Sequence, residues 1–144
     1  MILPDVNVLV SAFRVESEGH EQYRRWLTRL VAGADVLALH DAVLAGFLRV
    51  VTNARIITPP APTPLAVAFL ERLTDARRVH WLPSAPSTWT HLAELVADDR
   101  AIAANLVPDA HLAAVCLAHG AALATADRGF ARYPGLRWFD PIRS

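Results

Sequence analysis

Short apolar segments alternate with longer stretches of helical periodicity along the chain. Residues 18–32 illustrate the helical pattern, because Tyr23, Trp26, Leu27 and Leu30 recur three or four positions apart. Strands that alternate with helices build a parallel sheet that is covered on both faces. The alternation therefore predicts an α/β fold, a three-layer α/β/α sandwich with a central, mainly parallel sheet. We expect strands at residues 2–9, 36–39, 78–82, 121–125 and 136–139, and helices at residues 18–32, 41–51, 65–74, 87–98 and 108–119, with a proline-rich loop at 58–64.

Composition sets the size of the core and limits the class of partner. Hydrophobic residues make up 53% of the 144 residues, which is enough to bury a core and predicts one domain over residues 1–144. Fourteen basic and fourteen acidic residues give a net charge of zero, which argues against a generally basic, DNA-coating protein. A local cationic rim remains possible, and every basic residue is an arginine, which suits bidentate phosphate contacts.

The same sequence favours a cytoplasmic protein. Cys116 is the only cysteine, so an intrachain disulfide is impossible, and its apolar helical surroundings predict a buried thiol. Asp5 and Asn7 interrupt the apolar N-terminus, which lacks the positive leader of a signal peptide. No apolar run reaches the roughly 18 residues that a membrane span needs.

Three aspartates stand where an α/β sheet places its chemistry. Asp5 ends the first expected strand, Asp127 follows the fourth, and Asp109 lies in the first turn of the helix that leads into the fourth. Ligands of open α/β sheets bind beyond the carboxyl ends of the strands, near the point where strand order reverses. If the first and fourth strands are neighbours, the three carboxylates converge. Each aspartate alone also fits a cap or a turn, so their joint placement carries the argument.

A cluster of carboxylates calls for a cation. Two carboxylates ~5 Å apart repel by about 3 kcal/mol at an effective dielectric near 20, and they raise one another's pKa unless a cation neutralises them. Oxygen ligands, without cysteine or a zinc-like histidine pair, favour Mg²⁺, with Mn²⁺ as a possible substitute. Such an ion activates water and stabilises charge on a phosphodiester, so metal-assisted phosphodiester hydrolysis is the chemistry that the cluster predicts.

Several segments together resemble the PIN-domain ribonucleases, specifically the VapC-like toxins of bacterial toxin–antitoxin pairs. The matching segments are residues 5–9 (DVNVL), 47–55 (FLRVVTNAR), 105–114 (NLVPDAHLAA), 125–130 (TADRGF) and 130–138 (FARYPGLRW). The resemblance implies a PIN-like fold, Mg²⁺-dependent endonucleolytic cleavage of an RNA substrate, a homodimer, and inhibition by a VapB-like antitoxin.

The resemblance also assigns residues to roles. Asp5, Asp109 and Asp127 fall on the acidic positions of the family, as catalytic and metal-binding residues. Asn7, Asn105 and Thr125 fall on the polar supporting positions of the family, where they would orient ligands or water. Arg14, Arg49 and Arg128 are candidates for RNA phosphate contacts, with salt bridging as the ordinary alternative.

Two residues depart from the family pattern. Gly46 stands where many members have an acidic residue, usually glutamate, and Pro4 removes a hydrogen-bond donor from an expected central strand, which predicts an irregularity just before Asp5. The change at Gly46 leaves open a catalytically impaired module that binds RNA or protein. A phosphatase-like enzyme with Asp5 as nucleophile is a further alternative, but Asn7 stands where such enzymes have a second aspartate.

The remaining histidines and tryptophans have ordinary interpretations. His111 and His119 lie on the helix after Asp109 and favour partly exposed surface positions. The four tryptophans stand at apolar periodic positions, which favours the core or a dimer interface over base stacking. They are Trp26, Trp81, Trp89 and Trp138.

Overall fold

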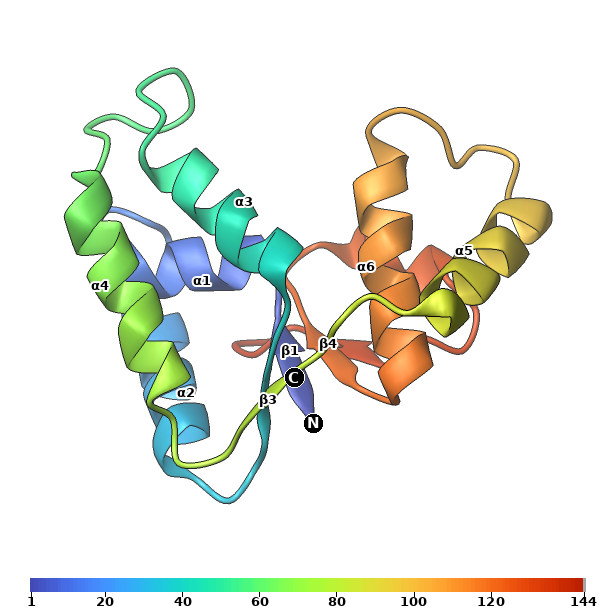
Figure 1. Ribbon diagram of the computed structural model, residues 1–144. Helices are drawn as coiled ribbons and strands as arrows, with labels where there is room; N and C mark the ends of the chain where they lie inside the picture. Colours follow the sequence, from blue (N-terminus) through green and yellow to red (C-terminus); the bar gives the residue numbers. More distant parts are fainter. Residues whose placement is uncertain (144) are drawn as a thin grey trace.

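A computed structural model describes residues 1–143, which form one five-stranded sheet and its covering helices (Figure 1). The strands are β1 (Ile2–Pro4), β2 (Leu37–Leu39), β3 (Val79–Trp81), β4 (Ala122–Ala124) and β5 (Trp138–Phe139). The helices are α1 (Val6–Phe13), α2 (His20–Ala32), α3 (Asp41–Val51), α4 (Thr63–Thr74), α5 (Pro86–Asp98), α6 (Leu106–His119) and the short 3₁₀ helix η1 (Arg128–Arg132). The expected helices begin within two residues of the observed ones, and they end at the expected residue.

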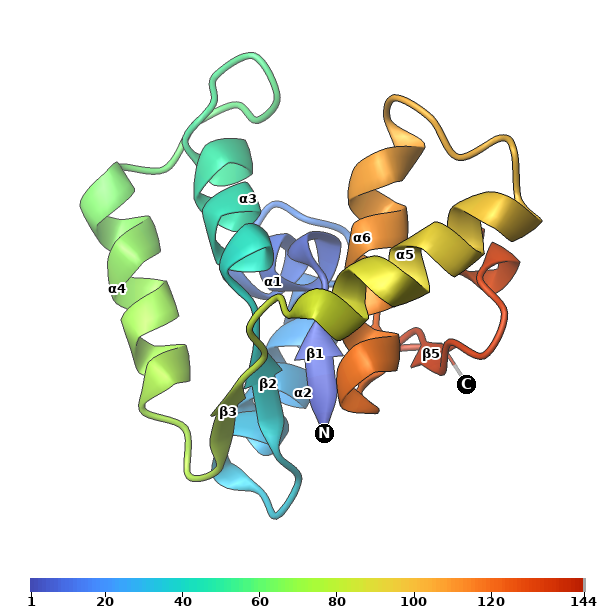
Figure 2. The ribbon, with the colours of Figure 1, turned by 45° about the vertical axis from the view of Figure 1, so that its right-hand side comes forward.

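The sheet is parallel throughout and has the order β3-β2-β1-β4-β5. The chain moves from β1 to β2 and β3 in one direction and then returns to β4 on the other side of β1. Since crossovers between parallel strands are right-handed, the two halves of the path must cover opposite faces. Figures 1 and 2 show α1 to α4 on one side of the strands and α5 and α6 on the other. The predicted α/β sandwich is confirmed, and strand order reverses between β1 and β4.

The first strand is shorter than expected, and the expectation of a strand over residues 2–9 was wrong. Pro4 ends β1, and the apolar residues after Asp5 form α1. Val8, Leu9 and Ala12 are buried there, at helical spacing. A short apolar run does not distinguish a buried strand from a buried helix by periodicity alone, which is why α1 was missed.

Pro4 produces no irregularity inside a strand, because it stands at the strand's end. The amide of Ile2 points toward β2 and donates to the carbonyl of Val36 (2.9 Å), whereas the amide of Asp5 points the other way and donates to Ala124 (2.9 Å). Alternate residues of a strand share a direction, so the nitrogen of Pro4 faces β2. The β1–β2 register is confined to Ile2 and Leu37, and the missing donor therefore lies beyond the paired region.

The start of α3 differs from expectation, whereas the end of α6 does not. The sequence favours Asp41 as the N-cap of the helix at residues 41–51, but His40 precedes α3 as its cap and Asp41 lies in the first turn. The end of α6 follows expectation, because Gly120 adopts the left-handed conformation (φ 66°) that stops a helix.

The core lies between the sheet and both helical layers. Phe47 of α3 and Phe130 of η1 are its largest fully buried side chains, and Leu3 and Leu123 are fully buried in the two central strands. Cys116 is buried as predicted. Among residues 1–143, no helix has both the length and the apolar character to cross a bilayer.

Candidate active site

A cleft of about 840 Å³ opens at the carboxyl ends of β1 and β4, where strand order reverses. Its walls come from α1 and the residues that flank it, from one face of α3 and the loop after it, from the first turn of α6 and from Asp127 in the loop after β4. Asp5, Asp109 and Asp127 all line this cleft. The structure thus brings Asp5 together with Asp109 and Asp127, which lie more than a hundred residues later in the sequence, because β1 and β4 pair directly.

Asp5 is the most firmly held of the three. It precedes α1 and caps it, since its Oδ1 accepts a hydrogen bond from the amide of Val6 (2.7 Å). Its Oδ2 accepts from the Thr125 hydroxyl (2.8 Å) and from the Asn7 side-chain amide (3.0 Å). Three donors on one buried carboxylate fix its orientation and leave it few alternative rotamers.

Thr125 and Asn7 join the two strand ends into one network. The fully buried Thr125 hydroxyl accepts from the Asn7 amide group (3.0 Å) and from the backbone amide of Asp127 (3.1 Å). The Asn7 Oδ1 accepts from the amide of Ala126 (3.0 Å). Both residues therefore hold the loop after β4 against the start of α1, the kind of contact that the supporting role requires.

Asp127 and Asp109 are held more loosely. Asp127 is exposed, and its Oδ1 accepts from the amide of Gly129 (2.8 Å) as the cap of η1. Asp109 is half-buried in the first turn of α6, where the helix dipole favours an acid. Within residues 1–143, no hydrogen bond reaches the Asp109 carboxylate.

The electrostatics of the cleft disfavour three negative charges. Burial raises the pKa of the Asp5 carboxyl above its ordinary value, and nearby Asp127 raises it further, while the hydrogen bonds from Thr125, Val6 and Asn7 oppose the shift. Burial also raises the pKa of Asp109, with further contributions from Asp5 and then Asp127. The carboxylates therefore repel one another across the cleft, and a cation would relieve that repulsion.

The donor set fits a hard divalent cation held partly through water. All three candidate ligands are carboxylates, and Mg²⁺ commonly binds through one or two carboxylates while it keeps several waters. Among residues 1–143, no group of three or more His, Cys, Asp and Glu side chains is already arranged to hold a metal ion by itself. The cleft thus fits an ion shared between carboxylates and water, and not a closed site in which protein atoms supply most ligands.

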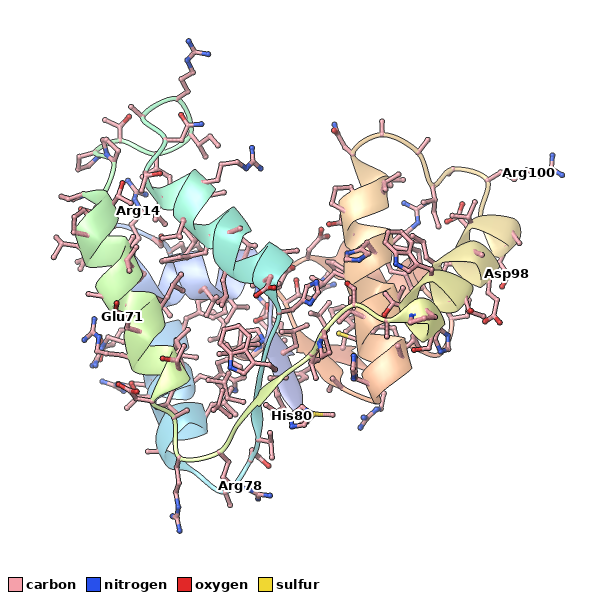
Figure 3. The ribbon with its side chains drawn as sticks, viewed as in Figure 1. Arg14, Glu71, Arg78, His80, Asp98 and Arg100 are labelled. Atoms are coloured by element: carbon pink, nitrogen blue, oxygen red, sulfur yellow. The ribbon has the colours of Figure 1, made fainter. Side chains whose placement is uncertain are left out.

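Two of the three arginines expected to contact RNA line the same cleft. Arg14 donates to the carbonyl of Thr58 (2.7 Å), which holds its guanidinium beside the loop after α3 (Figure 3), and Arg49 is exposed on α3. Arg128 does not line this cleft; it lines a separate, smaller pocket of about 440 Å³ together with Trp138. The cleft therefore combines acidic groups at its floor with two cationic groups from α1 and α3.

Asn105 does not join this arrangement. It is exposed immediately before α6, it does not line the cleft, and among the described residues no side-chain hydrogen bond links it to a carboxylate. Its placement therefore differs from that of Asn7 and Thr125, and the supporting role expected of it stays a prediction.

Gly46 faces the cleft at the position where an acidic residue was expected. A Cβ built there would lie 3.1 Å from Cγ2 of Val6, at the first turn of α1. The glycine therefore lets α1 and α3 approach closely, and no acidic residue enters the cleft from α3. Sequence reasoning also gave no signal for Ala42 and Ala45, whose small side chains shape this wall.

Comparisons with known proteins find relatives over nearly the whole chain. The family model described as the PIN domain matches residues 2–136. Ribonuclease VapC43 of Mycobacterium tuberculosis is 42% identical over 142 residues, which are 99% of this chain and 96% of that protein. Ribonuclease VapC31 of the same organism is 38% identical over 143 residues, which are 98% of this chain and 99% of the relative.

Solved structures share the fold at lower identity. The structure of VapBC2 from Rickettsia felis, bound to a DNA fragment from its promoter, contains a chain that matches with a TM-score of 0.70 and 20% identity, over 97% of this chain and 98% of the other. FitAcB from Neisseria gonorrhoeae matches with a TM-score of 0.66 and 20% identity, over the full length of both chains. At this identity the likeness establishes the fold alone.

Proposed function

This chain belongs to the PIN-domain family, and from that premise we propose that it is a Mg²⁺-dependent endoribonuclease that acts as the toxin of a toxin–antitoxin pair. The observation that carries the proposal is the cleft at the β1–β4 junction, where three carboxylates meet two arginines. Relatives that are 38% and 42% identical over nearly the whole chain are named ribonucleases, which supports RNA as the substrate.

We assign each residue of the cleft a part in phosphodiester hydrolysis. Asp5, Asp109 and Asp127 would hold the Mg²⁺, directly or through water. When bound, the ion supplies a polarised water and stabilises charge that develops on the phosphodiester. Thr125 and Asn7 keep the Asp5 carboxylate in a fixed orientation, so that it need not reorganise as charge develops.

The remaining groups position the substrate and accept a proton. The Arg14 and Arg49 guanidinium groups would bind the phosphates that flank the cleaved bond. Asp127 is exposed and accepts one hydrogen bond, from Gly129, so it retains free lone pairs. We propose it as the carboxylate that accepts the proton of the attacking water.

Charge-removing variants test the assignment. We expect Asp5→Asn and Asp109→Asn each to reduce Mg²⁺-dependent RNA cleavage by a factor of 100 or more, an order of magnitude typical for the loss of a proton-transfer or electrostatic group. Asp98→Asn is the matched control, because Asp98 is exposed at the end of α5, far from the cleft (Figure 3). Circular dichroism checks that each variant folds. Cleavage that survives EDTA and both cleft variants would contradict the proposal.

The same assay separates the enzyme from the alternative that Gly46 favours. A catalytically impaired module would bind RNA without cutting it, so binding of labelled RNA with no cleavage by the unaltered chain in Mg²⁺ or Mn²⁺ would favour that alternative. The sequence places no carboxylate at position 46, and the structure leaves little room for one, because a Cβ there would lie 3.1 Å from Cγ2 of Val6.

Two partners complete the proposal. We propose that a VapB-like antitoxin inhibits the chain and that the chain forms a homodimer. Co-expression with the VapB-like protein should relieve growth inhibition, and sedimentation velocity should report twice the chain mass. A monomer that cleaves RNA with an unchanged specific activity would contradict the dimer, and growth inhibition that persists in the presence of the VapB-like protein would contradict the antitoxin.

A further inference from the structure

Three aromatic rings form a row beside the carboxylate cleft. The Trp89 ring of α5 lies 5.4 Å from the His111 ring of α6, and His111 lies 5.6 Å from the His40 ring at the start of α3. The successive rings are tilted by 41° and 46°. The row runs from the interior to the surface, since His40 is 5% exposed and Trp89 is 58% exposed. Trp89 therefore lies outside the core, and the dimer interface, the other position that its spacing favours, stays a prediction.

The inner end of the row is anchored. The His40 Nδ1 lies 2.7 Å from the carbonyl of Leu82, which follows β3, and a ring nitrogen at that distance must carry the proton. The backbone beneath Trp89 is fixed by fully buried Thr88, whose hydroxyl accepts from the amide of Ala85 (3.1 Å). The start of the helix that carries Trp89 is therefore anchored to the interior of the molecule through Thr88.

Two of the three rings belong to helices that also line the cleft. His40 caps α3, whose Ala42 and Ala45 line the cleft, and His111 lies two residues after Asp109 on α6. The turned view of Figure 2 shows the beginning of α5 crossing in front of α6, the helix whose first turn carries Asp109. A polymer in the cleft would therefore pass from α6 to α5 to reach Trp89.

We propose that Trp89, supported by His111 and His40, is a stacking platform for an unpaired base of the RNA strand whose backbone occupies the carboxylate cleft. The proposal rests on the proposed function. A flat ring exposed on one face is the surface on which proteins stack unpaired bases of single-stranded RNA. The side chains exposed around Trp89 at the start of α5 are small or polar, namely Pro86, Ser87 and Thr90, so they would leave room for a planar base.

A binding assay in a non-cleaving background tests the platform. The probe is a short fluorescein-labelled single-stranded RNA of mixed sequence, and the protein is the full chain with Asp109→Asn. Adding Trp89→Ala should raise the Kd by roughly 5- to 100-fold, the range that corresponds to the loss of one stacked base. Trp89→Phe should lose much less RNA affinity, because phenylalanine keeps an aromatic ring on which a base can stack. Trp81→Ala is the matched control, since Trp81 is also half-exposed but lies on β3.

A second probe isolates stacking from backbone contacts. The same oligonucleotide with abasic sugars keeps its phosphates and loses its bases, so Trp89→Ala should change its Kd less than two-fold. Equal losses for both probes would overturn the stacking role. An unchanged Kd for the intact RNA in Trp89→Ala would overturn it as well.

The outcomes distinguish this inference from the proposed function. Suppose that the Asp109→Asn chain, which is the parent in this assay, binds RNA, that the unaltered chain cleaves RNA, and that adding Trp89→Ala has no effect. The stacking inference then fails while the proposed function stands. If the parent chain binds no RNA, both fail. Val96 lies two turns after Trp89 on the same face of α5 and is also exposed. Sedimentation velocity should therefore be run on each variant, because a monomeric Trp89→Ala with unaltered RNA affinity would assign the ring to an interface between two copies of the chain.

Discussion

The Asp5 carboxylate shows how one residue can be both a structural cap and a candidate ligand. It accepts hydrogen bonds from Val6, Asn7 and Thr125, which is more than the capping of α1 requires. One extra donor, Thr125, comes from the end of β4, and the other, Asn7, comes from the first turn of α1. The residue that caps α1 is therefore also the one that ties α1 to β4.

Asp109 provides the sharpest prediction at the residue scale. Its folded-state pKa is raised, so between the unfolded and folded values the folded chain holds more protons, and the free energy of unfolding falls as pH rises through that window. In metal-free buffer, Asp109→Asn should therefore raise the unfolding temperature at neutral pH. We expect about 1–3 °C, or less than about 1 kcal/mol, because solvent screens a half-buried carboxylate.

The pH dependence separates this effect from a general change in packing. The gain should disappear below the ordinary pKa range of aspartate, where the carboxyl is protonated in both states. Differential scanning fluorimetry across acidic to neutral pH measures it, with Asp98→Asn as the control. An unfolding temperature that falls at neutral pH in Asp109→Asn would show that the carboxylate stabilises the fold.

At the scale of elements, α6 connects the cleft to the far side of the molecule. Its first turn carries Asp109, its middle is buried against the sheet, and Gly120 ends it in the left-handed conformation at φ 66°. A Cβ at Gly120 would meet no atom within 4 Å, so a substitution there changes backbone strain and nothing else. The helix thus offers a way to alter stability at one end without touching the site at the other.

We predict that Gly120→Ala lowers the free energy of unfolding by about 1–2 kcal/mol, the cost of a left-handed conformation for a residue with a Cβ. Gly120→Asn should lower the free energy of unfolding by less, because asparagine tolerates the left-handed conformation better than alanine. Urea denaturation measures both variants. RNA cleavage per folded molecule should remain unchanged, and an Ala variant as stable as the parent would contradict the strain argument.

For the whole molecule, a net charge of zero limits how RNA can be attracted. Since the net charge supplies no general attraction, we expect the chain to attract RNA through local guanidinium groups, here those of Arg14 and Arg49 that line the cleft. The cleft is therefore expected to bind RNA with a weaker dependence on salt than a basic nucleic-acid-binding protein shows.

The salt dependence gives a numerical test. With about 0.7 counterions released per phosphate on single strands, two contacts predict a slope of log K against log salt of about −1 to −2. Fluorescence anisotropy with the Asp109→Asn chain measures it. Arg49→Gln should reduce the magnitude of the slope by about 0.7, whereas Arg100→Gln should not, because Arg100 projects away from the molecule beyond α5 (Figure 3). A slope steeper than about −4 would require a larger basic surface than this cleft provides.

The amino-acid sequence by itself determined the α/β class, the helix ends and the positions of the acidic residues along the chain. Periodicity and caps are local, so residues such as Gly120 and the apolar face of residues 18–32 carry that information without reference to the rest of the fold. The tertiary structure decided which strands are neighbours, and hence that Asp5 and Asp127 meet. It also decided that Asn105 lies outside the cleft while Thr125 points inward, that residues 6–13 form a helix, and that Trp89 faces solvent. These outcomes depend on strand pairing and packing between segments far apart in the chain. A short stretch of sequence does not determine the free energy of such long-range contacts.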